Sequence, residues 1–218
     1  EDRKNGNIKM VGGLVETNIS GRDYGVGIRI LDKFNSIYAY TNDSSRENLI
    51  KVAKEAAAAL NNNQMDIRLN LMKRDTSNNN PVKRHLSSVD KKHKIDLLRQ
   101  GYEAAKAYDS VISQVAVNYL EDEQKVLIAN SDGLLVNDSR IRTRYAIQSV
   151  ASKDGEMQVG YYAPGASMGF EFYDTIDVKE VGREASRIAV TSVHADHCPS
   201  GVMPVIIDNE FGGVLFHE

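Results

Sequence analysis

The sequence predicts an α+β protein, in which antiparallel sheets pack against helices. Strand-like segments occur in neighbouring pairs, separated by glycines or short polar turns, which is typical of antiparallel hairpins. Between these pairs the spacing of apolar residues changes to the helical period, so helices and strands alternate in blocks. The chain has 218 residues, 41% of them hydrophobic, which is enough for one good core or two smaller ones.

The composition excludes several classes of protein. The chain has 27 Lys and Arg against 30 Asp and Glu, and a formal net charge of −3, so it lacks the basic character of a dedicated nucleic-acid binder. A nucleic-acid partner is therefore not expected. The single Cys cannot form an internal disulfide. No membrane association is expected either, because no stretch approaches the roughly 20 apolar residues that span a bilayer.

The first expected unit is an α+β unit over residues 1–72. Strands are predicted at 8–16, 24–31 and 37–41, where apolar and β-branched residues lie between glycines and polar turns. A helix follows, in which Ser44 and Glu47 fit a capping box and Asn61 to Asn63 mark the end. One further strand is predicted at 65–72. The apolar stripe that predicts the helix consists of Leu49, Val52, Ala53, Ala56, Ala57 and Leu60.

A basic linker is predicted at residues 73–94, because seven Lys or Arg face two Asp around a polar stretch. The middle α+β unit then covers 95–198. Its first helix is predicted at about 90–108, and an antiparallel meander follows. In that meander an acidic turn is expected at Glu121 to Glu123 and a second turn at Asn130 to Gly133.

The strand after the second turn has the clearest pattern in the chain. Four residues with a period of two predict a half-buried face, and the arginines between them predict a polar face. A turn at Lys153 to Gly155 is expected to lead into a strand at 157–162 and a glycine-rich loop. A third helix follows. The buried strand face is Ile141, Thr143, Tyr145 and Ile147, and the helix stripe is Val178, Val181, Ala185, Ile188 and Ala189.

Residues 199–218 are expected to begin a third, catalytic domain. A short strand is predicted at 202–207, and an apolar run closes the chain at Glu218. Because the chain starts at Glu1 and stops directly after this run, we expect it to be a piece of a longer protein.

Four patterns in the sequence are candidate binding sites. The glycines from Tyr24 to Gly27 lie in a strand pattern, so strand glycines are favoured over a phosphate loop. The ligand-type residues His194, Asp196, His197 and Cys198 are favoured as a polar connection, because adjacent side chains rarely point at one ion. The face of Arg140, Arg142 and Arg144 either binds a carboxylate or phosphate group or faces solvent. The basic linker has no interleaved aromatic residues that would stack on bases.

His217 and Glu218 are the candidate catalytic pair. They close an apolar run that begins at Gly212, so they could lie on a helix packed in a core, as in the zinc metallopeptidase motif. In that motif a neutral imidazole binds the metal, and the next carboxylate takes a proton from the metal-bound water. The second His that would complete the motif is not in this chain and could only follow Glu218.

The order of these segments resembles the TldD/PmbA family, described as zinc metallopeptidases and as modulators of DNA gyrase. The resemblance extends over nearly the whole chain. The segments that carry it are Gly25–Leu31, Ala39–Thr41, Asn130–Gly133, Pro199–Val205 and, most specifically, Gly212–Glu218.

The resemblance implies a cytoplasmic metallopeptidase that processes leader peptides or degrades unfolded polypeptides, as a homodimer or as a heterodimer with a PmbA-like subunit. It also implies that His217 is a metal ligand for one zinc ion and that Glu218 is the catalytic general base. The remaining ligands have no counterpart in these residues. The alternative is a non-catalytic partner, an assembly or peptide-binding module of the same family, in which His217 is an ordinary core histidine.

Overall fold

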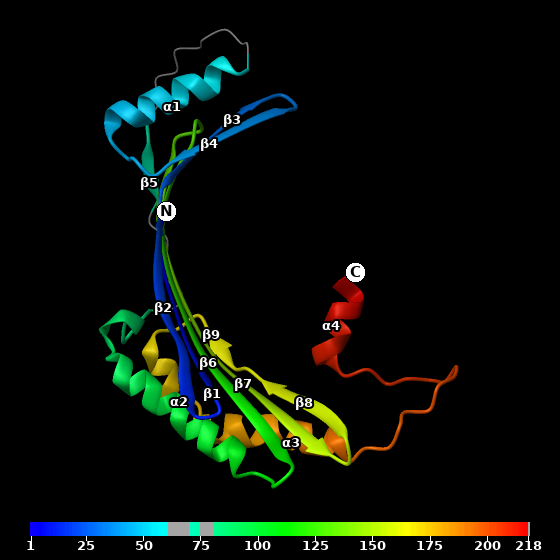
Figure 1. The fold of residues 1–218 in the computed structure, drawn as a ribbon. Coiled ribbons are helices and arrows are strands. Elements are labelled where there is room, and N and C mark those ends of the chain that lie inside the picture. The colour runs from blue at the N-terminus through cyan, green and yellow to red at the C-terminus, as the bar shows by residue number, and fades with distance from the viewer. Residues whose placement is uncertain (61–69, 75–80, 218) are drawn as a thin grey trace.

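A computed structural model describes residues 1–60, 70–74 and 81–217 (Figure 1). Its main feature is a long, curved sheet, which among the described residues has seven strands in the order β2-β1-β6-β7-β5, with β8 and β9 also paired to β7. All pairs are antiparallel except β5 with β7. The strands are β1 (Asp2–Val11), β2 (Leu14–Tyr24), β5 (Met72–Arg74), β6 (Ile112–Ala129), β7 (Leu134–Lys153), β8 (Glu156–Tyr162) and β9 (Gly165–Ala166).

The α+β fold class is confirmed, but the bounds of the first strands are corrected. A strand over 8–16 is wrong, because β1 turns into β2 within it, at Gly12 and Gly13. Both glycines have positive φ, 57° and 81°, the backbone conformation that a two-residue hairpin turn requires and that glycine adopts without strain. The predicted strand at 24–31 is likewise divided at Gly25, between β2 and β3 (Val26–Asp32).

The predicted acidic turn at Glu121 to Glu123 is also wrong, because β6 runs straight through it. Each carboxylate has a basic partner brought in by another element. Lys94 Nζ donates to Glu121 Oε2 at 2.6 Å, and Arg3 Nε donates to Asp122 Oδ1 at 2.8 Å. His85 Nδ1 lies 3.5 Å from Glu123 Oε1. The three acidic residues therefore stay in an extended strand. The turn at Asn130 to Gly133 is confirmed, and it joins β6 to β7.

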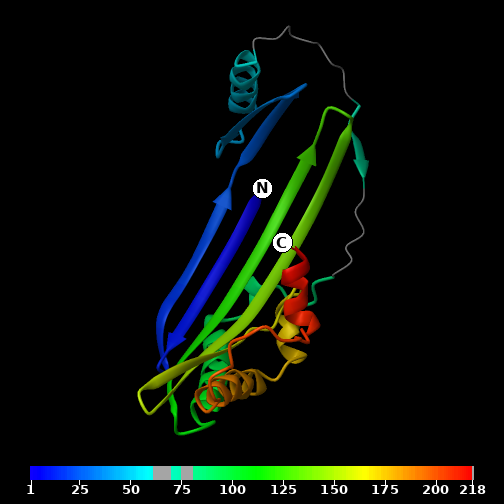
Figure 2. The same ribbon diagram turned by 90° about the vertical axis from the view of Figure 1, so that its right-hand side faces the viewer.

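Two helices, α2 (Lys91–Lys106) and α3 (Val178–Val193), cover one face of the sheet at its lower end (Figure 1). Both match the predicted helices, and an Asp caps each one. Asp90 accepts a hydrogen bond from the Lys92 N–H, and Asp177 accepts one from the Lys179 N–H. Figure 2 looks onto the sheet from the side on which the C-terminal helix lies.

The two helices cross at very short range. A Cβ on Gly182 of α3 would lie 2.4 Å from the Gly101 carbonyl oxygen of α2, so only glycine fits there. Ser186 Oγ donates to the Ala105 carbonyl oxygen at 2.8 Å, one turn further along α3. Small residues thus set the spacing between α2 and α3.

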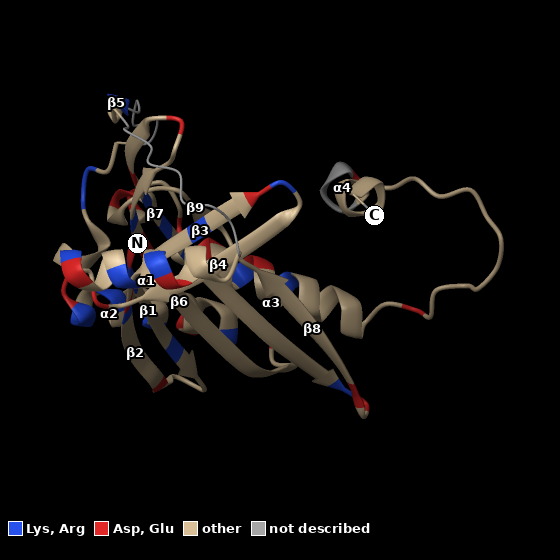
Figure 3. Cartoon of the chain, turned by 90° about the horizontal axis from the view of Figure 1, so that it is seen from above, with Lys and Arg blue, Asp and Glu red and all other residues tan. Residues whose placement is uncertain are grey.

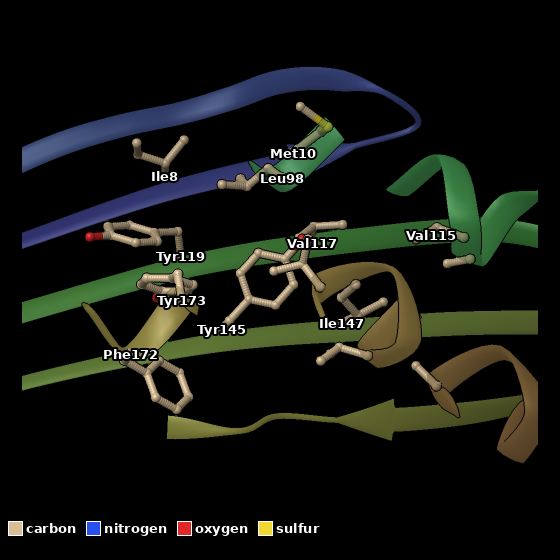
Figure 4. Packing of buried hydrophobic residues seen from close by; sticks show 14 of the residues in the cluster. Ile8, Met10, Leu98, Val115, Val117, Tyr119, Tyr145, Ile147, Phe172 and Tyr173 are labelled. Carbon is tan, nitrogen blue, oxygen red and sulfur yellow. The ribbon is translucent and has the colours of Figure 1, made fainter. Parts of the chain in front are cut away.

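An aromatic cluster fills the core between the helices and the sheet (Figure 4). Tyr119 and Tyr145 come from β6 and β7, and a short 3₁₀ helix, η2 (Phe170–Asp174), adds the others. The ring centroids of Tyr119 and Tyr173 are 5.6 Å apart, and those of Phe170 and Tyr173 are 4.9 Å apart. Thr143 and Tyr173 share a hydrogen bond of 2.7 Å, which satisfies the buried hydroxyls.

A smaller layer lies at the other end of the molecule, where α1 (Arg46–Ala58) packs on the hairpin of β3 and β4 (Asn35–Thr41) (Figure 1). The predicted capping box is off by one residue, since Ser45 accepts the bond from the Asn48 N–H. Ser44 instead accepts a hydrogen bond from the Tyr24 hydroxyl at 2.7 Å. The expected helix end at Asn61 to Asn63 lies outside the described residues.

The predicted linker at 73–94 contains several ordered parts, and residues 75–80 lie outside the described ranges. Its first residues belong to β5, and η1 (Leu86–Ser88) and the start of α2 follow. The predicted strand at 65–72 falls mostly on residues that are not described, although Met72 begins β5. The sheet combines β1 and β2 from the expected first unit with β6 to β9 from the middle unit. The exact domain boundaries stay a prediction.

Candidate functional site

The C-terminal helix α4 (Asn209–His217) carries the predicted metal ligand, His217, at its end. The helix begins with a hydrogen bond of 2.8 Å from the Gly212 N–H to the Asp208 carbonyl oxygen. Gly212 and Gly213 each disfavour a helix by about 1 kcal/mol relative to Ala. A short helix with two such residues depends on tertiary contacts for most of its stability.

The helix is not packed into a core among the described residues. Val214 and Leu215 are exposed, and Phe216 is 95% exposed. The strand predicted at 202–207 is absent from the described structure as well, because those residues run without a paired strand and Ile206 is fully exposed. Figure 3 shows few charged residues along this segment and α4. Exposed apolar side chains therefore lie both in the segment before α4, from Val202 to Ile207, and in the second half of α4, from Val214 to Phe216.

The described residues do not by themselves fit a zinc ion. Within them, no group of three or more His, Cys, Asp or Glu lies close enough to hold a metal, whereas a catalytic zinc takes about three protein ligands. His217 is exposed at the end of α4. Glu218 lies outside the described residues, so its role as a general base stays a prediction.

The structure does not bring the loop from His194 to Cys198 together as a metal site. His194 Nδ1 lies 2.8 Å from the Val190 carbonyl oxygen, at the C-terminal end of α3. His197 and Cys198 are exposed further along the loop.

The glycines at Tyr24 to Gly27 do not form a phosphate loop. The Gly25 N–H already donates to the Glu1 carbonyl oxygen, at 3.1 Å. A Cβ on Gly27 would lie 2.4 Å from the Tyr38 hydroxyl across the β3–β4 pair, so this glycine makes room for a side chain. Both glycines line a cavity of about 760 Å³ whose floor includes Leu49 and Val126.

The three arginines of β7 lie on the sheet face opposite α2 and α3, as their alternation with buried residues predicts. Arg140 Nε donates to Asp138 Oδ2 at 2.6 Å. Arg144 Nε donates to the Ala163 carbonyl oxygen at 3.4 Å. Arg142 and Arg144 both line a second cavity, of about 780 Å³, at the point where β9 meets β7.

Sequence reasoning missed the part of this second cavity that β1 supplies. Arg3, Asn5 and Asn7 line it, but they precede the strand predicted to start at residue 8. No local alternation marked this part of the strand, because residues 1–7 are polar or glycine at every position and lack the apolar half of a period-two pattern.

Comparison with known proteins identifies the family. A family model described as the PmbA/TldA metallopeptidase central domain matches residues 84–193, about half of the chain. A second, described as PmbA/TldA metallopeptidase domain 1, matches residues 1–60. The chain belongs to the PmbA/TldD metallopeptidase family. The resemblance stated from the sequence motifs is thus confirmed.

Relatives of this PmbA/TldD chain are named metalloproteases. A metalloprotease from Methanothermobacter thermautotrophicus is 29% identical over 216 residues, which cover 97% of this chain and 46% of the relative. A metalloprotease TldD homologue from Haemophilus influenzae is 28% identical, over 94% of this chain and 44% of its own length. The chain therefore spans less than half the length of these relatives.

Solved structures share the fold of the PmbA/TldD chain. A Thermotoga maritima protein proposed to modulate a DNA gyrase superposes with a TM-score of 0.74 at 19% identity, over 92% of this chain and 45% of that one. TldE from Thermococcus kodakarensis gives a TM-score of 0.56 at 15% identity, over 85% of this chain and 42% of its own. Within the described ranges, no helix is long and apolar enough to cross a bilayer.

Proposed function

We propose that the chain forms the N-terminal and middle parts of a zinc metallopeptidase subunit that processes or degrades unfolded peptides. The observation that carries this proposal is the end of α4, where an apolar helix reaches His217 directly before Glu218. The helical conformation at His217 agrees with the metallopeptidase motif. Membership in a family whose relatives are named metalloproteases supports the same activity.

In this proposal His217 supplies one zinc ligand, Glu218 is the general base, and the other ligands come from residues beyond Glu218. The exposed apolar side chains of α4 agree with this arrangement. Burying one such side chain stabilises a protein by about 1.5–3 kcal/mol, so Val214, Leu215 and Phe216 are expected to be covered in the complete subunit.

Zinc content and peptidase activity, measured on the protein encoded by the complete natural reading frame, test the proposal. We expect His217→Ala to reduce bound zinc and Glu218→Gln to retain zinc but lose activity, because the amide cannot accept the proton. Exposed His197 provides the matched control, and His197→Ala is expected to keep both. Full activity in Glu218→Gln would show that the assigned base is wrong.

The second candidate is a non-catalytic partner or peptide-binding module of the same family. It is favoured by the exposed position of His217, which belongs to no group of three or more His, Cys, Asp or Glu in the described part of the chain. The reading frame after residue 218 separates the candidates. A His after three intervening residues supports the peptidase, and its absence within one helical turn supports the module.

We further propose that the subunit acts in the cytoplasm, as a homodimer or as a heterodimer with a PmbA-like subunit. Light scattering of the complete protein, alone and mixed with such a subunit, tests this assembly. A third candidate, suggested by the family's description as modulators of DNA gyrase, is direct action on the machinery that sets DNA topology. Salt-dependent retention on DNA tests it, because a protein that neutralises phosphates must show such retention. A net charge of −3 leads us to expect no such retention.

A further inference from the structure

The open face of the sheet contains a hollow that is separate from the His217 end of the chain. It has a volume of about 780 Å³ and lies where β9 and the preceding loop meet β7. Two cross-strand rows form its floor, one from Asn5 through Asp122 to Arg142 and the next from Asn7 through Leu120 to Arg144. The charged and amide residues in its lining are Arg3, Asn5, Asn7, Glu121, Asp122, Arg142 and Arg144. The Glu121 carboxylate itself is bonded to Lys94 of α2, on the covered face of the sheet.

The hollow has an uncompensated positive charge. Asp122 is already occupied by Arg3, whose Nε and Nη2 atoms donate to the two carboxylate oxygens at 2.8 and 3.1 Å. Within the described residues, Arg142 and Arg144 have no carboxylate partner. They are two positions apart on one strand face, about 7 Å along the strand, so both guanidinium groups can reach the same ligand. A guanidinium pairs with a carboxylate through two parallel hydrogen bonds.

The same hollow has an unsatisfied acceptor. Asn7 Oδ1 is buried and has no hydrogen-bond partner among the described residues. An unpaired buried polar atom costs about 1–3 kcal/mol, and turning the Asn7 amide toward a ligand N–H in the hollow would remove that cost. The hollow therefore suits a ligand that carries both a carboxylate and an N–H group, which a polypeptide does.

A nucleic acid fits the hollow less well. Its phosphodiester groups offer acceptors alone, so they cannot supply the N–H group that Asn7 would accept. The lining has no aromatic side chain on which a base could stack. The charge of the whole chain, −3, also opposes a polyanion.

We propose that this hollow binds an extended polypeptide segment through a carboxylate, which pairs with Arg142 and Arg144, while Asn7 accepts a backbone N–H. The choice of a polypeptide as the ligand rests on the proposed peptidase function. The site is a binding site for substrate away from His217, and it favours segments with an acidic side chain or a free C-terminus.

Fluorescence anisotropy with the full chain tests this proposal. The probe is a fluorescein-labelled octapeptide of Gly and Ser with a central Glu-Glu pair and an amidated C-terminus. Two control peptides have a central Gln-Gln pair instead, one with an amidated C-terminus and one with a free C-terminal carboxylate. They distinguish binding through an acidic side chain from binding through the C-terminus. We expect the double variant Arg142→Gln/Arg144→Gln to weaken binding of the carboxylate peptides about tenfold, and Asn7→Ala to weaken it about threefold.

Arg140→Gln is the matched control. Arg140 lies on the same face of β7, is exposed, pairs with Asp138 and does not line the hollow, so its loss is expected to change affinity less than about twofold. Thermal unfolding verifies that every variant is folded.

Three outcomes would overturn the proposal. The first is that the uncharged, amidated Gln-Gln peptide binds as tightly as the Glu-Glu peptide. The second is that the arginine double variant binds the carboxylate peptides as tightly as the unchanged chain does. The third is tighter, arginine-dependent binding of a labelled dT12 oligonucleotide. None of these readouts involves His217 or Glu218, so failure of this site and failure of the peptidase proposal are distinguishable.

Discussion

Glu171 shows how one buried side chain holds two distant segments together. Its carboxylate accepts hydrogen bonds from the backbone N–H groups of Lys83, Arg84 and Gly169, at 3.1, 2.8 and 3.1 Å. Burial by itself raises the pKa of this carboxyl group, but these backbone donors outweigh burial and hold the pKa at about 2. The segment before α2 is thereby fixed to η2.

Replacing Glu171 is expected to make the free energy of unfolding depend less on pH in the acidic range. A carboxyl pKa lowered from 4.5 to about 2 means that the ionised form stabilises the fold fully above pH 4.5 and progressively less down to pH 2. Glu171→Gln should therefore reduce the free energy of unfolding by about 3 kcal/mol at pH 7, and the deficit should shrink between pH 4.5 and 2. Urea unfolding at several pH values measures this difference.

Glu184 on α3 is the control for Glu171. It pairs with Arg187 on the same helix surface, at 2.7 Å, and surface pairs contribute at most about 1 kcal/mol. Glu184→Gln should leave stability nearly unchanged. An equal loss in both variants would contradict the special role of the Glu171 carboxylate.

At the scale of elements, the crossing of α2 and α3 depends on glycine. A Cβ at position 182 would lie 2.4 Å from the Gly101 carbonyl oxygen and 3.1 Å from the Ala105 nitrogen. Gly182→Ala must therefore push the two helices apart, and overpacking of this kind costs about 1–3 kcal/mol. We expect a lower midpoint of thermal unfolding, measured by circular dichroism.

Gly213 in α4 is the matched glycine without such a constraint. A Cβ there meets nothing within 4 Å, and Ala favours a helix by about 1 kcal/mol over Gly. Gly213→Ala should leave the unfolding midpoint unchanged or raise it. An equal loss in both alanine variants would contradict the close helix approach as its cause, because the backbone-entropy effect of Gly→Ala favours the folded helix.

At the scale of the whole molecule, the two ends of the structure differ in how well they are packed. β1 contributes Ile8 and Met10 to the main core, whereas β3, β4 and α1 form a layer with many exposed apolar side chains. Local stability follows the density of buried apolar contacts. Amides of β1 should therefore exchange with deuterium more slowly than those of β3 and β4.

Hydrogen–deuterium exchange with mass spectrometry checks this order of protection. Peptides from β6 provide the internal reference, because β6 pairs with β1 over the whole length of that strand. Faster exchange in β1 than in β3 would contradict a common core for the long sheet.

The order of the chain's motifs was enough to recognise the family from the sequence. The fold class, the helices α2 and α3 and the polar face of β7 could likewise be predicted without a structure. These features follow from local signals, since a period of two or of 3.6 residues and an N-terminal Asp cap require no distant partner. The motif of Gly212 to Glu218 was recognisable for the same reason.

The way in which distant segments meet could not be predicted from local patterns. β6 stays extended through Glu121 and Asp122 because Lys94 and Arg3 supply the opposing charges, and Arg3 lies 119 residues away in the chain. The hollow likewise combines Asn7 of β1 with Arg142 and Arg144 of β7, which no local pattern connects. Pairing between strands is set by the balance of burial and charge over the whole sheet, so it became visible only in the folded chain.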